Sequence, residues 1–242
     1  MSVRAFFREN PAALVGAVLA LVLAVVAIVG PQVTSADPNA IDVTSRFRGP
    51  SAIHPLGTDD LGRDTLARIV YGSRTSLVIA FLATLMGTLG GHAIGLLSGF
   101  VGGWLDALIM RVADIQLSFP AILIALILLA VLGQGTGKII AALVTVQWAY
   151  YARTVRSAAL VEREKEYIEA AKVLALPRWR VVVKHLLPNC LPPLIVVATV
   201  QVAHAIALEA TLSFLGLGLP ITEPSLGLLI ANGFQYLMSG KY

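Results

Sequence analysis

Long uncharged stretches alternate with polar segments along this chain, and their lengths predict membrane-spanning helices. A bilayer core about 30 Å thick needs about 20 apolar residues in helical form. Five stretches approach this length: residues 12–29, a part of 75–105, 115–132, 139–152 and 186–208. The fourth is short, but the long side chains of Lys138 and Arg153 at its ends can reach outward to the membrane surface, which lets the helix continue beyond the apolar stretch. We therefore predict an all-α, polytopic membrane protein with five transmembrane helices, and an interfacial or re-entrant segment at 224–240.

Composition supports a membrane protein. Of the 242 residues, 57% are hydrophobic and 13% are charged, and the mean hydropathy is +0.81. An ordinary soluble domain is excluded. The net charge of +4 would suggest nucleic acid in a soluble protein, but the basic residues flank apolar stretches, so topology explains the charge and we expect no nucleic-acid partner. Cys190 is the only cysteine, so a disulfide within the chain is impossible and a packing role is expected.

The distribution of basic residues predicts the orientation. Eight of the 18 lie between the fourth and fifth stretches, which makes that loop cytoplasmic. Counting back places the N-terminus in the cytoplasm. Three parts result: a tail with the first helix (1–36), an extracytoplasmic loop (37–74), and a core transmembrane domain (75–242) with a cytoplasmic coupling loop at 153–188. A cleaved signal peptide is the alternative for the first stretch, but its apolar run is too long and we favour an uncleaved anchor.

The extracytoplasmic loop contains a turn-rich strip followed by apolar residues at helical spacing. We predict an amphipathic helix lying on the membrane, with Thr58 or Asp59 as its N-cap. Asp59, Asp60 and Asp64 form a cluster of carboxylates, and such clusters also suit Ca²⁺. We favour helix capping and salt bridges to Arg63 and Arg68 over a cation site.

A glycine recurs at every fourth position of the second stretch, at Gly87, Gly91, Gly95, Gly99 and Gly103. One helix face is therefore free of side chains, which allows another backbone to approach closely. Such a stripe either lines a permeation path or packs against a helix of the same or a partner subunit, and we favour packing. His92 and His204 have no second ionisable residue one turn away, so we interpret both as polar packing residues.

The cytoplasmic loop predicts two short helices joined by a bend. Helix-forming residues run from 162 into Glu169 and Ala170, and Leu176-Pro177 forces a break. A second helix begins near Pro177 and carries Trp179, Val182 and Val183 toward Pro188. Such a rigid knob suits a groove on a soluble partner, whereas a merely solvated basic loop is the alternative.

This loop resembles the EAA motif of ABC importer permeases: Glu-Ala-Ala, three residues, Gly, nine residues, Ile, one residue, Leu-Pro. The matching residues are Glu169, Ala170, Ala171, Leu187 and Pro188. His185 at the isoleucine position resembles the dipeptide, oligopeptide and nickel subfamily. Ala175 occupies the glycine position, where a positive φ would strain alanine; the alternative is a turn at Leu176-Pro177 instead.

Further stretches resemble the second permease subunit of dipeptide-type importers: residues 54–64, 102–106, 111–114, 118–120, 151–156 and 212–218. The resemblance implies a type I importer fold in the bacterial cytoplasmic (inner) membrane. Its implied partners are a homologous permease, two cytoplasmic ATPase subunits and an extracytoplasmic solute-binding protein, besides the lipid bilayer. It implies alternating access driven by ATP and Mg²⁺ bound in the ATPases, with no cofactor here. The family usually has six spans, so we expect this chain to be truncated.

Missing motifs agree with a transport subunit that is not an enzyme. The Gly-rich run 133–138 lacks the first glycine of a P-loop, which falls at Leu132, and Ile139 replaces its Ser or Thr. No HExxH or GxSxG motif supports a membrane hydrolase. An ion-coupled secondary transporter would need an ionisable group at mid-membrane, and Glu209 is the only candidate. We expect no catalytic residue and no metal site; the predicted cargo is a peptide, with nickel or glutathione as alternatives.

Overall fold

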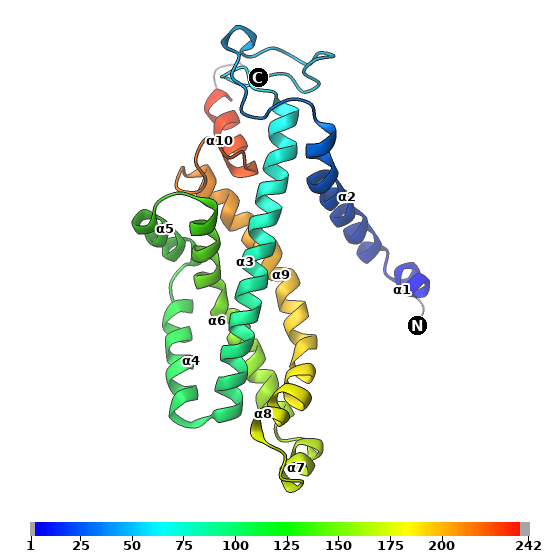
Figure 1. Ribbon diagram of the computed structural model, residues 1–242, viewed down its shortest axis with the longest axis vertical. Helices are drawn as coiled ribbons and strands as arrows, with labels where there is room; N and C mark the ends of the chain where they lie inside the picture. The colour runs from blue at the N-terminus through cyan, green and yellow to red at the C-terminus, as the bar shows by residue number, and fades with distance from the viewer. Residues whose placement is uncertain (1–2, 238–242) are drawn as a thin grey trace. The chain divides into compact units, whose positions relative to one another are not determined.

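The computed structural model describes residues 3–237, and this part of the chain is helical without a β-strand (Figure 1). The elements are α1 Val3–Glu9, α2 Pro11–Val33, the short turn η1 Val43–Ser45, α3 Thr65–Val101, α4 Gly103–Leu117, α5 Ala121–Leu132, α6 Thr136–Glu162, α7 Glu166–Val173, α8 Arg178–Arg180, the π-helical turn η2 Val181–Leu186, α9 Leu187–Phe214 and α10 Leu226–Tyr236. The predicted all-α class is confirmed. The chain forms two compact units, Met1–Val78 with Leu219–Tyr242, and Ile79–Gly218.

Three helical runs are long and apolar enough to cross a membrane: Pro11–Val33, Thr65–Val101 and Arg178–Phe214. They correspond to the first, second and fifth predicted stretches. The third stretch is not one straight helix, because α4 and α5 meet at an angle of 91°. Pro120 precedes α5, and a proline pushes the preceding residue out of helical geometry. Counted as one bent span, this pair brings the candidates among the described residues to four, against the five predicted.

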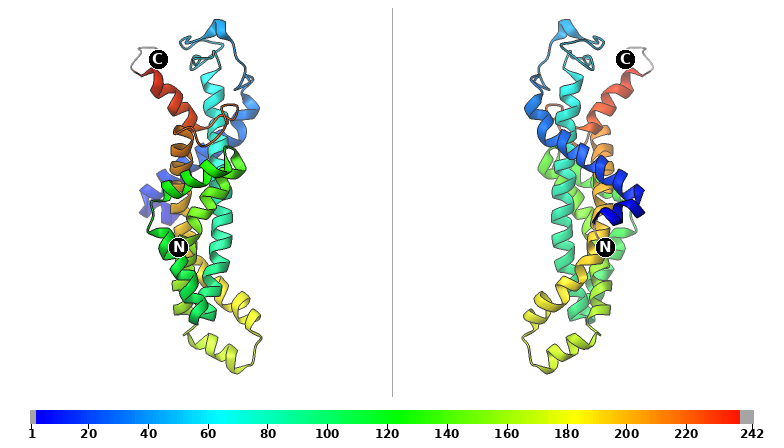
Figure 2. Two further views of the ribbon diagram at one scale, coloured as in Figure 1. Left: turned by 90° about the vertical axis from the view of Figure 1, so that its left-hand side faces the viewer. Right: turned by 90° about the vertical axis from the view of Figure 1, so that its right-hand side faces the viewer.

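Helix α6 covers the fourth predicted stretch and is the central helix of the second unit. It has 27 residues, and its buried face extends from Ile139 to Ala159. It lies beside α9 in every view (Figure 1, Figure 2) and also contacts α4 and α5. Neighbouring helices thus shield its polar residues, including the buried Gln147. Helix α6 is therefore long enough to span a membrane, although its polar residues keep it out of the apolar candidates.

Four of the five stripe glycines pack against α6 of the same chain. A Cβ atom on Gly91 would lie 2.5 Å from the Cβ of Tyr151, and one on Gly95 would lie 2.5 Å from the Ala152 carbonyl oxygen. The predicted helix-packing role is therefore observed for Gly87, Gly91, Gly95 and Gly99. Gly103 departs from the prediction: α3 ends at Val101, Gly103 has a φ of +62°, and a Cβ atom added to it would meet nothing within 4 Å.

The polar side chains of the spans are mostly paired. His204 Nδ1 lies 2.8 Å from Gln201 Oε1, whereas His92 is buried and its Nε2 has no partner among the described residues. Glu209 is fully buried and accepts a hydrogen bond from Ser213 Oγ at 2.8 Å. Glu209 is therefore enclosed by protein. Cys190 is also buried, in a cluster with Leu186 and Leu194, which agrees with its predicted packing role.

The predicted amphipathic surface helix is wrong. Residues 58–64 form turns and a single β-bridge between Thr58 and Asp64, and α3 then begins at Thr65 and continues without interruption through position 75. The helix is capped by Asp64, whose Oδ1 accepts a hydrogen bond from the Ala67 N–H at 2.7 Å, rather than by Thr58 or Asp59. No proline interrupts the sequence from 65 to 101, so the local helix extends directly into the apolar run, and the predicted boundary at 74 falls inside α3.

The predicted salt bridges of this segment are present. The Asp59 carboxylate lies 2.7 Å from Arg63 Nε and 3.5 Å from Arg68 Nε. Among the described residues, no three His, Cys, Asp or Glu side chains are placed so that they could hold a metal ion together. The broken apolar segment at 224–240 forms α10, which is capped by Ser225 through a hydrogen bond from the Leu228 N–H at 3.2 Å. Residues 238–240 lie outside the described residues.

Candidate functional site: the loop between α6 and α9

The loop between α6 and α9 has one short helix and one long one. Helix α6 ends at Glu162 and α7 begins only at Glu166, so the predicted helix starting at 162 is interrupted. The second predicted helix does begin after Pro177, but it is not short. It runs through α8 and η2 into α9, as one helical run from Arg178 to Phe214. The motif therefore sits directly on the end of a spanning helix.

The junction of α6 and α7 is bridged by the Glu162 carboxylate. Its Oε1 lies 2.6 Å from Lys165 Nζ, and its Oε2 accepts a hydrogen bond from the Tyr167 hydroxyl at 2.6 Å. The hydrogen bond from Lys165 lowers the pKa of Glu162, and burial, together with the Glu162 contact, raises the pKa of Tyr167 to about 12. Because the carboxyl pKa is depressed, this bridge stabilises the fold at neutral pH and is lost as pH falls through that lowered pKa.

The turn after α7 is made at Ala175, which has a φ of +52°. The Leu176 N–H donates to the Ala171 carbonyl at 3.1 Å, and the Ala175 N–H donates to the Lys172 carbonyl at 2.9 Å. This pair of bonds is the Schellman pattern, in which the residue after the helix is left-handed and usually glycine. The alternative turn at Leu176-Pro177 is therefore wrong, and alanine occupies a glycine conformation.

Replacing this alanine by glycine should stabilise the loop. Left-handed backbone costs an L-residue about 1–2 kcal/mol, and glycine removes that cost while losing more entropy on folding. We expect Ala175→Gly to raise the free energy of unfolding by about 0.5–1 kcal/mol. The measurement is the melting temperature of the purified protein. Ala170→Gly, inside α7, is the control and should lower stability by about 1 kcal/mol; a loss in both variants would contradict the assignment.

The Glu-Ala-Ala segment has two exposed residues and one buried residue. Ala171 is buried with Ile168 and Val181. Glu169 and Ala170 are exposed, and the same face of α7 includes Val173 and Leu174, which are 86% and 72% exposed. We call this exposed surface the α7 ledge; it consists of Glu166, Glu169, Ala170, Val173 and Leu174.

The other motif residues lie off the ledge. Leu187 packs against the core cluster that contains Leu194, whereas Ala175, Pro177 and Pro188 are exposed. Phe100, near the end of α3, packs against both this core cluster and the Ile168 cluster. The loop is therefore joined by apolar contacts to α3 as well as to its own flanking helices.

An ion pair that connects α4 to α6 beside the loop was not predicted from the sequence. Asp106 of α4 accepts from Arg156 of α6 through both oxygens, at 2.5 and 2.6 Å, and Ser98 Oγ of α3 donates to the same carboxylate at 2.5 Å. Arg163 Nη1 also donates to the Gly99 carbonyl at 3.0 Å. Bidentate pairs of this kind fix geometry. Asp106 is the first charged residue after the uncharged stretch 75–105, which was the available signal, but its partner is 50 residues away.

Comparison with known proteins agrees with the fold and the motif. Residues 91–240 match the family described as binding-protein-dependent transport system inner membrane component, and residues 2–50 match the N-terminal TM domain of oligopeptide transport permease C. The chain belongs to the binding-protein-dependent permease family, so it is a multi-pass membrane permease of an ABC transporter. The family resemblance seen in the sequence is confirmed.

Several curated relatives extend over most of the chain. It is 38% identical to the probable D,D-dipeptide transport system permease protein DdpC of Escherichia coli K12, covering 96% of this chain and 78% of that protein. It is 38% identical to the dipeptide transport system permease protein DppC of Alkalihalophilus pseudofirmus, covering 97% and 77%. With the oligopeptide transport system permease protein OppC of Bacillus subtilis the identity is 36%, covering 96% and 76%.

Proposed function

We propose that this chain is the permease subunit of a peptide importer and that separate ATPase subunits drive it through the α7 ledge. The observation that carries the proposal is the exposure of Glu169 and Ala170 on a short helix whose opposite face is packed against Val181 and Phe100. A protruding helix with one docked face suits insertion into a groove of a soluble partner. Relatives named as dipeptide and oligopeptide permeases support the cargo class.

The proposed coupling follows from how α7 is attached. Two cytoplasmic ATPase subunits bind ATP and Mg²⁺, and their closure pushes on the ledge. On one side, the Glu162 bridge to Lys165 and Tyr167 connects α7 to α6. On the other, the helix after Pro177 runs without a linker into α9. A push on α7 therefore tilts two packed helices together, which is what alternating access requires of a rigid-body element.

The proposed assembly contains a homologous second permease and an extracytoplasmic solute-binding protein. It lies in the bacterial cytoplasmic membrane with the N-terminus and the α7 loop in the cytoplasm. The support for this orientation is the concentration of eight of the 18 basic residues in the loop, since short cytoplasmic loops are enriched in Lys and Arg. The chain itself needs no cofactor in this scheme.

The energy source and the cargo are tested in one preparation. The complete transporter is reconstituted in vesicles, and uptake of a labelled dipeptide is followed with ATP on the side of the α7 loop. We expect uptake to require ATP and to persist when ionophores collapse the ion gradients. Uptake that follows the gradient at constant ATP would instead indicate a secondary transporter. Competition by unlabelled nickel complexes or glutathione, without competition by dipeptides, would replace the peptide assignment by one of those alternatives.

A further inference from the structure

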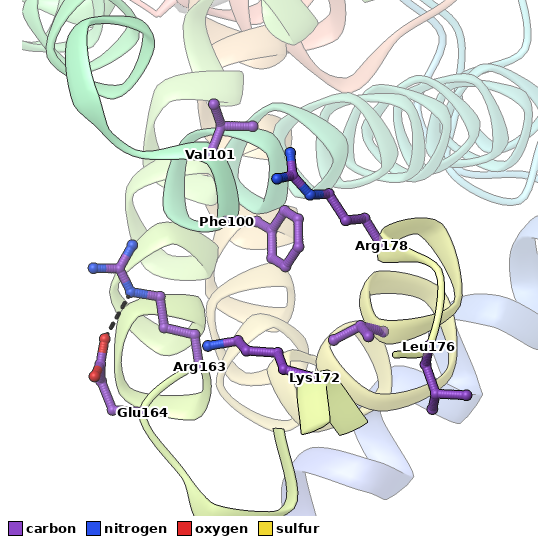
Figure 3. A pocket seen from close by; sticks show the side chains of 8 residues that line it. Phe100, Val101, Arg163, Glu164, Lys172, Leu176 and Arg178 are labelled. Carbon is purple, nitrogen blue, oxygen red and sulfur yellow. Dashed lines mark hydrogen bonds and ion pairs between the residues drawn. The ribbon is translucent and has the colours of Figure 1, made fainter. Parts of the chain in front are cut away.

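A pocket of about 500 Å³ opens where the end of α3, the end of α6, α7 and α8 meet (Figure 3). Three cationic side chains line it, from Arg163, Lys172 and Arg178, and Figure 3 shows them around Phe100. Apolar walls come from Phe100 and Val181. The pocket thus combines positive charge with an apolar wall at the end of a spanning helix.

The positive charge of this pocket is not balanced within the chain. Glu164 is the one carboxylate of the lining; it is 72% exposed and pairs with Arg163 Nε at 3.0 Å. The side chains of Lys172 and Arg178 have no hydrogen-bond or ion-pair partner among residues 3–237. Two cations therefore remain available for an anionic ligand, and a phosphate group accepts hydrogen bonds from both Lys and Arg.

The position of the pocket relative to the bilayer favours a lipid. Phe100 and Val101 are the last two residues of α3, one of the candidate spans, so the pocket lies at one end of a spanning helix. Under the proposed function, on which this step rests, that end is cytoplasmic. The inner leaflet carries anionic headgroups that attract basic side chains, and an acyl chain leaving the pocket would pass along the exposed Val101.

The pocket is separate from the surface assigned to the ATPase. Lys172 and Ala170 are two residues apart on α7, which places their side chains about 160° apart around the helix axis. Lys172 shares its side of α7 with the buried Ile168, whereas Ala170 belongs to the exposed α7 ledge. A soluble subunit centred on Ala170 would therefore approach α7 from the side away from Lys172.

We propose that this pocket binds the phosphate group of an anionic phospholipid from the cytoplasmic leaflet, with Lys172 and Arg178 as its cationic partners. The occupied pocket ties the α7 loop to the membrane surface. Phosphatidylglycerol is the probe. The complete transporter is placed in nanodiscs that contain phosphatidylglycerol and phosphatidylcholine, and the phosphatidylglycerol retained by the released complex is quantified by native mass spectrometry.

The test compares two double variants with equal loss of charge. K172Q with R178Q removes both pocket cations, and R180Q with K184Q removes two exposed cations that do not line the pocket. At about a fivefold affinity change per cation, the pocket variant should bind phosphatidylglycerol roughly 30-fold more weakly. The control keeps both pocket cations and should be weakened less. Equal weakening in both variants would overturn the proposal, since the attraction would then belong to the whole basic surface.

Two further arms separate the possible ligands. Inorganic phosphate is added in excess; displacement of phosphatidylglycerol by it would indicate a site for a free anion and overturn the lipid assignment. If the pocket variant keeps its phosphatidylglycerol but loses its ATPase subunit, the pocket is a protein contact and the proposal is also overturned. The measurement of lipid retention does not depend on uptake. The result on lipid binding can therefore be interpreted even if the peptide-importer proposal fails.

Discussion

Ala170→Trp is expected to abolish coupled uptake without unfolding the permease. Ala170 is exposed on the α7 ledge between Glu169 and the buried Ala171. An indole ring at this position fills the space that the partner groove must occupy, and the loss of a central interface contact costs at least about 2 kcal/mol, or roughly 30-fold. The measurements are ATP-driven uptake by the reconstituted transporter and the melting temperature of the purified permease. Uptake should fall at least about 30-fold while the melting temperature stays unchanged.

The neighbouring alanine provides the matched control. Ala171 is 4% exposed and packs in the cluster with Ile168 and Val181. Ala171→Trp should therefore lower the free energy of unfolding by about 1–3 kcal/mol or more through overpacking, whereas Ala170→Ser should keep both uptake and stability. Normal uptake in Ala170→Trp, or a loss of uptake that only follows a loss of folded protein, would contradict the proposed role of the α7 ledge. Glu169→Lys tests the same surface by reversing a charge.

Gly95→Ala is expected to destabilise the second unit by forcing α3 and α6 apart. Its Cβ would lie 2.5 Å from the Ala152 carbonyl oxygen and 2.9 Å from Val155 Cβ. Both neighbours belong to the interior of α6 and have no flexible end that moves aside. Separating the two helices to admit the methyl costs about 1–3 kcal/mol. Thermal unfolding in detergent, followed by helix content, measures the effect as a lower melting temperature.

Gly90→Ala is the control for this packing prediction, because a Cβ at Gly90 meets no atom within 4 Å. Alanine has a higher helix propensity than glycine, so this variant should be neutral or more stable by up to about 1 kcal/mol. The two variants add the same atom to the same helix five positions apart. A stable Gly95→Ala protein would show that α3 and α6 do not approach each other as closely as described.

The spans were predictable where hydrophobicity alone decides the structure. The apolar run in α2 and the one in α9 have the length that a bilayer needs, and both form single helices. The run at 115–132 shows the limit of this reasoning, because its composition hides the 91° bend before α5. Pro120 is visible in the sequence, but a proline in an apolar run is compatible with a kinked helix or with a break, and the neighbouring helices decide between them.

By itself, the sequence determined the helical membrane class, the glycine-rich face of α3 and the position of the Glu-Ala-Ala motif after α6, because each depends on residues close together in the chain. Only the tertiary structure decided that the glycines meet α6, that Asp106 pairs with Arg156, and that Ala170 is exposed while the adjacent Ala171 is buried. Residue spacing defines the face of a helix on which a side chain lies. The element that covers that face depends on contacts between segments far apart in the chain, which local patterns do not encode.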